Sequence, residues 1–292
     1  MREERTEPSQ AGRFVSANGI RLHYLDHSGE GPPLLLLPGL TANAHSFDGL
    51  IKAGLSRWFR VLALDLRGRG KSDKPDSGYS MADHAADVVA LMDALELRSA
   101  IIGGHSFGGL LTIYLAANYP DYVSRLVILD ASVGLVNPIV RDLIKPSLQR
   151  LGKEVPSWDE YIGAMKRAPF YEGWWDSTIE SYYRADVVFN DDGSVRARSR
   201  PENIMEAIDR VEDEDWLKHV ARVRQPAILI HAPEPFGPAD FPSVVSQQDA
   251  DLTVKCFANC RYEKVPGNHM TMLFGQGASR MVSLIREFAG RE

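Results

Sequence analysis

A serine held between two glycines constrains the fold of this chain more than any other feature. The pentapeptide 104–108 (Gly-His-Ser-Phe-Gly) lies between the apolar run 100–102 and the helix-like stretch 110–118. A strand that turns sharply into a helix at such a serine lifts the hydroxyl clear of the backbone, and the glycines leave room for neighbouring chain. The new helix offers unpaired N–H groups that stabilise an oxyanion. The pattern indicates a nucleophile elbow at Ser106; the alternative is a glycine-rich turn with an incidental serine.

Short apolar runs recur along the chain with helix signals between them. The runs are 34–37, 61–64, 100–102, 126–129, 227–230 and 262–265. Such runs are typical of strands buried on both faces. A capping-box pattern at 80–83 opens an amphipathic stretch that reaches Leu95. The alternation predicts a mostly parallel, doubly wound sheet, and Asn18-Gly19 predicts an antiparallel hairpin at one edge.

One connection is much longer than the others. Roughly ninety residues separate the strand ending at Asp130 from the strand starting at Ala227, where a few residues and one helix are usual. Four of the five tryptophans lie in this segment. A single aromatic residue at helical spacing is usually a core residue. As a group, however, these aromatic residues indicate a helical cap over an apolar pocket. The predicted division is a disordered N-terminus at 1–12, a core at 13–131 and 223–292, and a cap at 132–222.

Composition excludes several classes of protein. The net charge is −6 and the pI about 5.8, without a large basic cluster, which argues against a nucleic-acid partner. No stretch approaches ~18 uninterrupted apolar residues, and residues 1–10 lack the apolar core of a signal peptide, so we expect a cytoplasmic protein without a membrane span. Cys256 and Cys260 lack the partners of a zinc site, so no metal is expected and both thiols are expected to be reduced.

A serine nucleophile needs a base, an acid that orients the base, and donors for the oxyanion. Among the eight histidines, His269 follows the last predicted strand and precedes the final predicted helix at 278–288, which makes it the candidate base; the alternative is a structural loop histidine. His105 adjoins the serine, but its side chain is expected to point away from Ser106. The others considered, His23, His27 and His219, lie in edge or insertion segments.

With these motifs in order, the chain resembles the α/β-hydrolase superfamily over almost all of its length. The segments that carry the resemblance are 34–40 (LLLLPGL), 65–72 (DLRGRGKS), 104–109 and Asn268-His269. The resemblance implies an α/β fold with a doubly wound, mostly parallel eight-stranded sheet, a helical cap insertion and no cofactor. It also implies that the backbone N–H groups of Leu40 and Phe107 hold the oxyanion. Pro38 and Arg69 stand where the family often has histidine, and neither position supplies a proton.

The triad acid stays open among three carboxylates. In the family it usually follows the seventh strand, but Pro235 occupies that offset, Glu234 lies one residue early between prolines, and Asp240 requires a bowed loop. Asp130 ends the predicted strand beside the nucleophile strand, where some family members have their acid. A carboxylate ending an apolar strand is costly unless paired, so Asp130 is preferred over Asp240 and Glu234. The alternative is that Asp130 caps the turn into the insertion.

These residues predict a serine hydrolase that cleaves a carboxylic ester or lactone with a small apolar acyl part, using Ser106, His269 and Asp130. C–C bond hydrolysis, amide hydrolysis and haloperoxidase chemistry also use a serine at the elbow and remain alternatives, as does a non-catalytic ligand receptor. The oligomeric state stays open. Basic residues of the insertion that are candidates to bind one substrate carboxylate are Arg141, Lys145, Arg167, Arg184 and Arg210.

Overall fold

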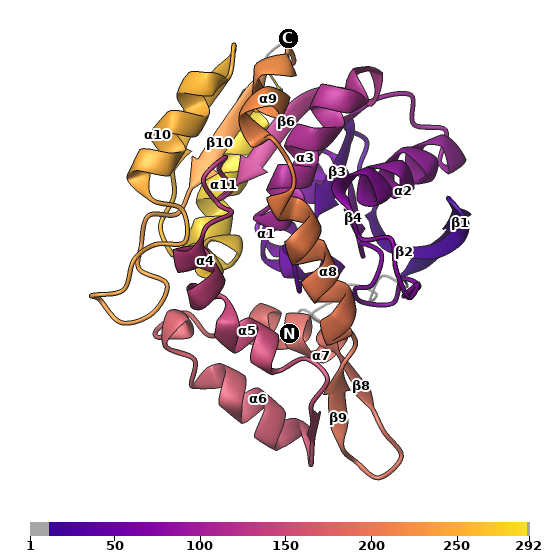
Figure 1. Cartoon of the computed structure of the whole chain (residues 1–292), viewed down its shortest axis with the longest axis vertical. Helices are drawn as coiled ribbons and strands as arrows, with labels where there is room; N and C mark the ends of the chain where they lie inside the picture. Colours follow the sequence, from indigo (N-terminus) through magenta and orange to yellow (C-terminus); the bar gives the residue numbers. More distant parts are fainter. Residues whose placement is uncertain (1–11, 291–292) are drawn as a thin grey trace, which may run out of the picture.

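A central eight-stranded sheet organises the chain in the computed structural model, which describes residues 12–290 (Figure 1). Its strand order is β1-β2-β4-β3-β5-β6-β10-β11. The strands are β1 (Arg13–Ala17), β2 (Ile20–His27), β3 (Pro33–Leu37), β4 (Arg60–Leu64), β5 (Ala100–His105), β6 (Val123–Leu129), β10 (Ala227–His231) and β11 (Cys260–Lys264). β2 pairs antiparallel with both β1 and β4, and all other neighbouring strands pair parallel, so the prediction of a mostly parallel, eight-stranded α/β sheet is confirmed. Apart from Gly12, the predicted disordered segment 1–12 lies outside the described residues.

The edges of the sheet differ from its centre. Asn18 and Gly19 both have positive φ, 49° and 76°, as a two-residue turn between twisted antiparallel strands requires. β11 forms the opposite edge, and its residues are half-buried or exposed, unlike those of the central strands. Edge strands carry polar side chains because one side faces water, which explains why this run is less apolar than the others.

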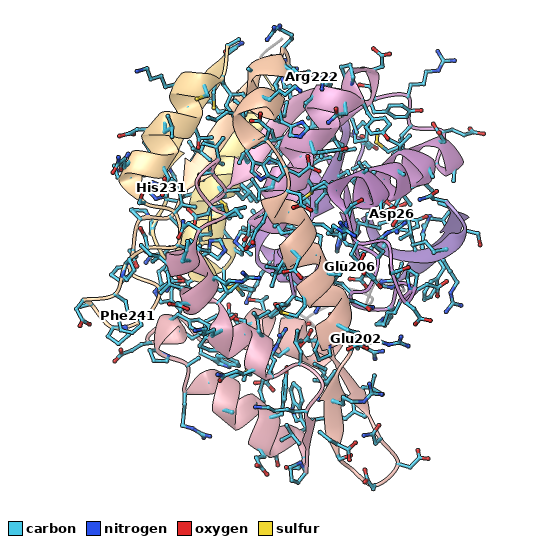
Figure 2. All side chains as sticks on the ribbon, in the orientation of Figure 1. Asp26, Glu202, Glu206, Arg222, His231 and Phe241 are labelled. Carbon is cyan, nitrogen blue, oxygen red and sulfur yellow. The ribbon has the colours of Figure 1, made fainter. Side chains whose placement is uncertain are left out.

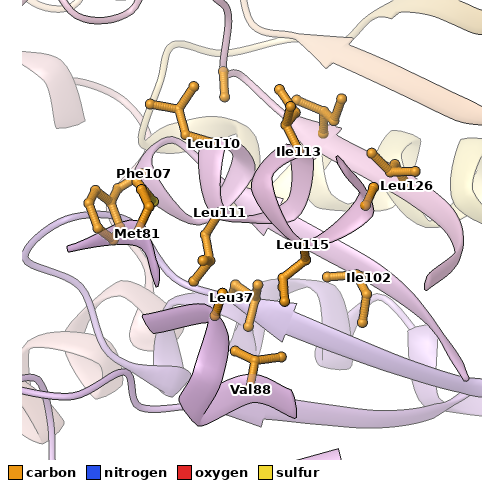
Figure 3. Close-up of a cluster of buried hydrophobic side chains, with 14 of the residues drawn as sticks. Leu37, Met81, Val88, Ile102, Phe107, Leu110, Leu111, Ile113, Leu115 and Leu126 are labelled. Atoms are coloured by element: carbon orange, nitrogen blue, oxygen red, sulfur yellow. The ribbon is translucent and has the colours of Figure 1, made fainter. Parts of the chain in front are cut away.

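Helices cover both faces of the sheet, and alternate strand residues pack against each layer. Leu35 and Leu37 belong to the buried cluster that includes α2, α3 and α9, and Figure 3 shows Leu37 with residues of α2 and α3. Leu34 and Leu36 belong to the cluster with α1 and α11. The core helices are α1 (Asp48–Lys52), α2 (Met81–Ala94), α3 (Phe107–Asn118), α9 (Trp216–Arg222), α10 (Gln247–Cys256) and α11 (Gly275–Ala289). Short 3₁₀ helices are η1 (Ala44–Phe47), η2 (Leu55–Arg57), η3 (Pro120–Tyr122), η4 (Pro169–Tyr171) and η5 (Thr271–Leu273).

Two predicted helices begin earlier than their apolar patterns. α3 starts at Phe107 because the Ser106 carbonyl accepts hydrogen bonds from the N–H groups of Gly109 (2.8 Å) and Leu110 (3.1 Å). α11 starts at Gly275 and not at residue 278. The predicted capping box of α2 is present, since Ser80 accepts from the Asp83 N–H and Asp83 accepts from the Ser80 N–H.

The segment between β6 and β10 is mostly helical but also contains a small sheet. Its elements are α4 (Pro138–Leu143), α5 (Lys145–Gln149), β7 (Glu154–Val155), α6 (Trp158–Lys166), α7 (Ser177–Asp186), β8 (Val187–Phe189), β9 (Val195–Ala197) and α8 (Pro201–Glu212). β7, β9 and β8 form a three-stranded antiparallel sheet, which the sequence pattern did not reveal because the strands are only two or three residues long.

The last two helices before β10, α8 and α9, contact the core. Glu206 of α8 accepts hydrogen bonds from the backbone N–H groups of Gly78 (3.0 Å) and Tyr79 (3.2 Å) (Figures 1 and 2). α9 packs on α3, with Trp216 and Val220 inside the core cluster. Within residues 12–290, no helix has both the length and the apolar character needed to cross a membrane.

Candidate active site

Ser106 stands at the sharp turn between β5 and α3. Its φ of 55° and ψ of −119° are outside the regions that a serine ordinarily occupies. Positions 104 and 108, two residues before and after Ser106, tolerate only glycine. A Cβ on Gly104 would lie 2.0 Å from the Gly108 carbonyl oxygen, and a Cβ on Gly108 would lie 2.1 Å from the Leu37 carbonyl oxygen. Ser106 is half-buried and lines a cavity. The local geometry is that of a nucleophile elbow.

Asp130 and His269 meet at the carboxyl edge of the sheet. Asp130 follows β6, is fully buried and accepts a hydrogen bond from His269 Nδ1 at 2.7 Å through Oδ2. Its other oxygen accepts from the backbone N–H of Ala232 at 2.9 Å. Because a carboxylate only accepts, Nδ1 of His269 carries the proton and Nε2 is left as the basic nitrogen. His269 lines the same cavity as Ser106.

The two other candidate acids lie elsewhere in this arrangement. Glu234 accepts a hydrogen bond from the backbone N–H of Gly267 at 2.8 Å, so it supports the loop that carries His269. Asp240 is exposed on the loop after β10, beside Phe241, and borders the cavity (Figure 2). Among the described residues, Asp130 is the only carboxylate that hydrogen-bonds to the His269 ring.

His105 has a position that the sequence did not reveal. Its buried ring packs against the His269 ring, with centroids 4.5 Å apart, and its Nε2 donates a hydrogen bond to the His269 carbonyl oxygen at 2.7 Å. Burial, and secondarily the neighbouring His269, lowers the pKa of His105 well below its usual value, so this ring is neutral. In the sequence, only the position of His105 beside Ser106 could have indicated this contact with His269. Any residue beside a nucleophile has such a position, so it does not identify the contact.

The loop after β3 lies directly over the elbow. A Cβ on Gly39 would be 3.6 Å from the Ser106 Cβ, and the Ala42 N–H closes the loop by donating to the Gly39 carbonyl at 3.1 Å. Leu40 and Phe107, whose N–H groups were the expected oxyanion donors, both line the cavity. Ser106, His269, Leu40 and Phe107 therefore all line a single cavity.

The cavity has a volume of about 900 Å³ and a mainly apolar lining. Its walls come from the elbow, from the insertion and from the loop after β10, including Leu110, Leu135, Val140, Phe170, Phe236 and Met270. Phe170 stacks on Phe236 with ring centroids 4.7 Å apart, and Phe236 contacts the His269 ring edge-on. Trp158 and Trp175, in contrast, pack against tyrosines within the insertion. Only part of the aromatic group expected over the pocket reaches it.

Comparison with known proteins gives the family. A family model described as alpha/beta hydrolase fold matches residues 32–181, about half of the 292-residue chain. The chain belongs to the α/β-hydrolase-fold family. N-formylmaleamate deformylase of Pseudomonas putida is 43% identical over 124 residues, 42% of this chain and 46% of that protein. The non-heme chloroperoxidase of Streptomyces lividans is 34% identical over 164 residues, 55% of this chain and 57% of that protein.

A solved structure extends the likeness to nearly the whole α/β-hydrolase chain. Crystalline E-2-(acetamidomethylene)succinate hydrolase superimposes with a TM-score of 0.81 over 96% of this chain and 99% of its own, at 23% identity. At that identity the match shows the fold alone. The chain spans about half the length of the curated relatives it matches.

The cations that line the cavity of this α/β hydrolase-fold chain are already paired. Arg141 lies 3.1 Å from Asp209 and 3.3 Å from Glu212, and the buried Arg150 lies 3.0 Å from Asp186. The other four basic candidates of the insertion, Lys145, Arg167, Arg184 and Arg210, do not line the cavity. Lys145 pairs with Asp142 and Arg210 pairs with Asp213. The guanidinium of Arg184 lies over the rings of Trp158 and Phe189. A substrate carboxylate would have to displace Asp186 from a buried pair to reach Arg150, whereas the pairs of Arg141 are exposed and weaker.

The described residues contain no group of three His, Cys, Asp or Glu side chains arranged to hold a metal ion. Cys256 and Cys260 are free and half-buried, and burial raises the pKa of the Cys260 thiol to about 12. A thiol with so high a pKa is a poor nucleophile at neutral pH.

The neutral His105 makes stability depend on pH. In the unfolded chain the His105 ring gains a proton as the pH falls below about 6.5, whereas in the folded protein it stays neutral. The free energy of unfolding therefore decreases as the pH falls, by up to about 1.4 kcal/mol per pH unit. His105→Gln places an amide donor near the position of Nε2 for the His269 carbonyl but cannot titrate. Urea unfolding of parent and variant at several pH values between 7.5 and 5 should show a shallower loss in the variant; identical pH slopes would contradict a neutral His105.

Proposed function

We propose that this chain is a serine hydrolase that cleaves a carboxylic ester or lactone with a neutral, apolar acyl part. The observation that carries the proposal is the buried hydrogen bond of 2.7 Å between Asp130 and His269, because His269 lines the same apolar cavity as the elbow serine. A basic His269 Nε2 and a strained serine are the two groups that acyl transfer requires.

In the proposed reaction, His269 Nε2 takes the proton from Ser106 as the serine oxygen attacks the substrate carbonyl carbon. The carbonyl oxygen becomes an oxyanion and accepts hydrogen bonds from the N–H groups of Leu40 and Phe107. Asp130 stabilises the imidazolium. The C–O bond then breaks, the leaving alcohol takes the proton from His269, and Ser106 remains acylated. Water gives a proton to His269, attacks the acyl carbon and releases the acid, and Ser106 regains its proton.

The lining of the cavity supports a neutral, apolar substrate. Phe170, Phe236 and the aliphatic side chains around them offer apolar contact to an acyl chain or ring, while both cavity arginines are held by carboxylates. Transferring an unpaired substrate carboxylate into this space costs free energy, because the nearby acidic groups repel it.

A panel of p-nitrophenyl esters from acetyl to dodecanoyl, with aliphatic lactones and hemisuccinate esters, tests the proposal. Since each buried methylene contributes about 0.8 kcal/mol, kcat/KM is expected to rise several-fold over the first few methylenes and then to level off when the cavity is filled. The hemisuccinate of matched length is expected to be poorer by at least about 10-fold. Preference for the hemisuccinate would contradict the neutral-substrate assignment.

Amide hydrolysis is the second candidate, favoured by the 43% identity to N-formylmaleamate deformylase over 124 residues. The same serine, base and oxyanion donors serve a C–N bond, with His269 protonating the amine as it leaves. Turnover of N-formyl or N-acetyl amides with no turnover of esters or lactones would assign this reaction. Failure of a fluorophosphonate to label Ser106 would instead leave a ligand-binding member of the fold.

A further inference from the structure

Arg69 is a completely buried cation without a carboxylate partner. It lies in the turn 65–72 and has no measurable exposure. Within residues 12–290, no Asp or Glu lies within ion-pair distance of its guanidinium, and its Nη2 has no hydrogen-bond partner. The nearby Arg67, in contrast, makes two hydrogen bonds of 2.6 Å to Asp87. A buried charge is costly unless it is paired, so an unpaired one calls for an explanation.

Neutral acceptors surround the guanidinium. Nε donates to the Leu40 carbonyl at 2.9 Å, and Nη1 donates to the Arg67 carbonyl at 2.7 Å and to His84 Nε2 at 3.1 Å. His84 donates from Nδ1 to the Ser80 carbonyl, so its Nε2 is an unprotonated acceptor. Burial lowers the pKa of Arg69 to about 10, which leaves it charged at neutral pH, and burial together with Arg69 lowers the pKa of His84 well below its usual value. The positive charge of Arg69 is therefore not neutralised locally.

Arg69 contacts other atoms of both residues whose N–H groups are the proposed oxyanion donors. Its Nε bond fixes the carbonyl of Leu40, and its guanidinium carbon lies 5.3 Å from the centroid of the Phe107 ring. Yet Arg69 does not line the cavity, so it is behind the oxyanion site and out of reach of the substrate. In a region of low dielectric, a fixed charge at short range acts strongly on charge that develops nearby.

We propose that Arg69 is a positioning residue for catalysis: it holds the Leu40 loop in place and provides a positive potential behind the oxyanion site. This inference rests on the proposed acyl transfer. A neutral substrate carbonyl gains little from such a potential, whereas the anionic tetrahedral intermediate gains more, so the interaction lowers the barrier without tightening substrate binding. Burying the charge lowers the stability of the folded state, as is common where an active site needs a preorganised electrostatic field.

Three variants separate the charge from the hydrogen bond. Arg69→Lys keeps the charge, Arg69→Gln keeps a donor without the charge, and Arg69→Met keeps neither. Lys71→Met is the control, because it removes a positive charge from the same turn at an exposed side chain that does not line the cavity. The readouts are kcat, KM and the affinity for an alkyl boronic acid, which forms a tetrahedral anion on an active serine. Urea unfolding verifies that each variant is folded at the assay temperature.

We expect kcat to fall by about 10- to 100-fold in Arg69→Met and Arg69→Gln, with KM within about threefold of the parent and boronate affinity falling in parallel with kcat. Arg69→Lys should retain more kcat than Arg69→Gln, and Lys71→Met should match the parent. Unchanged kcat in a folded Arg69→Met or Arg69→Gln, or a loss confined to KM, would overturn the inference while leaving the proposed function intact. If the parent itself neither turns over acyl substrates nor binds the boronate, the proposed function fails and this inference fails with it.

Discussion

Replacing Ser106 with alanine is expected to lower kcat by roughly 10⁴- to 10⁶-fold, because no other group in the proposed mechanism forms the acyl-enzyme. The fold should persist, since the Ser106 hydroxyl makes no described hydrogen bond that the elbow needs and alanine is smaller. The measurement is kcat on the best ester or lactone of the panel, together with labelling by a fluorophosphonate, which the variant should lose completely.

Ser199→Ala is a suitable control, because Ser199 is buried, lies outside the cavity and has a hydroxyl without a described partner. Its kcat should stay within about twofold of the parent, as is usual for substitutions away from the reacting groups. Substantial ester turnover in Ser106→Ala would show that the serine is not the nucleophile and would remove the acyl-enzyme from the mechanism.

Replacing Asp130 with asparagine is expected to lower kcat by about 10³- to 10⁴-fold. The amide offers His269 Nδ1 either an N–H, which favours the wrong tautomer, or a neutral oxygen, which stabilises the imidazolium less than a carboxylate does. The bond from the Ala232 N–H to Oδ1 can be kept, so the loss is expected mainly in kcat. The same kinetics on Asp240→Asn and Glu234→Gln complete the comparison.

Asp240→Asn should stay within about threefold of the parent, because its carboxylate is exposed and does not bond to His269. Glu234→Gln should have an intermediate effect, since it weakens the acceptor for the Gly267 N–H two residues before His269. A larger loss in Asp240→Asn than in Asp130→Asn would assign the acid to the loop after β10 in a rearranged state, and would contradict the role proposed for Asp130.

The sequence was most informative where the physical cause is local. The apolar runs predicted the central strands because strands buried on both faces leave no room for polar side chains, and 80–83 predicted the start of α2 because its cap is made within four residues. It was least informative for the insertion, where two- and three-residue strands are too short to show a period. The proposal of a neutral substrate also depends on the structure, because Arg141 is paired with carboxylates far along the chain.

By itself, the sequence determined the sheet architecture, the elbow at Ser106 and the short list of residues able to act with it. Each of these is encoded in a contiguous segment, where backbone conformation and residue size leave few choices. Only the tertiary structure decided which carboxylate meets His269, since Asp130 is 139 residues away in the chain. It also decided that His105 supports His269 and that Arg69 reaches the Leu40 loop without a counter-ion. Such contacts depend on how elements pack in space, which no local pattern specifies.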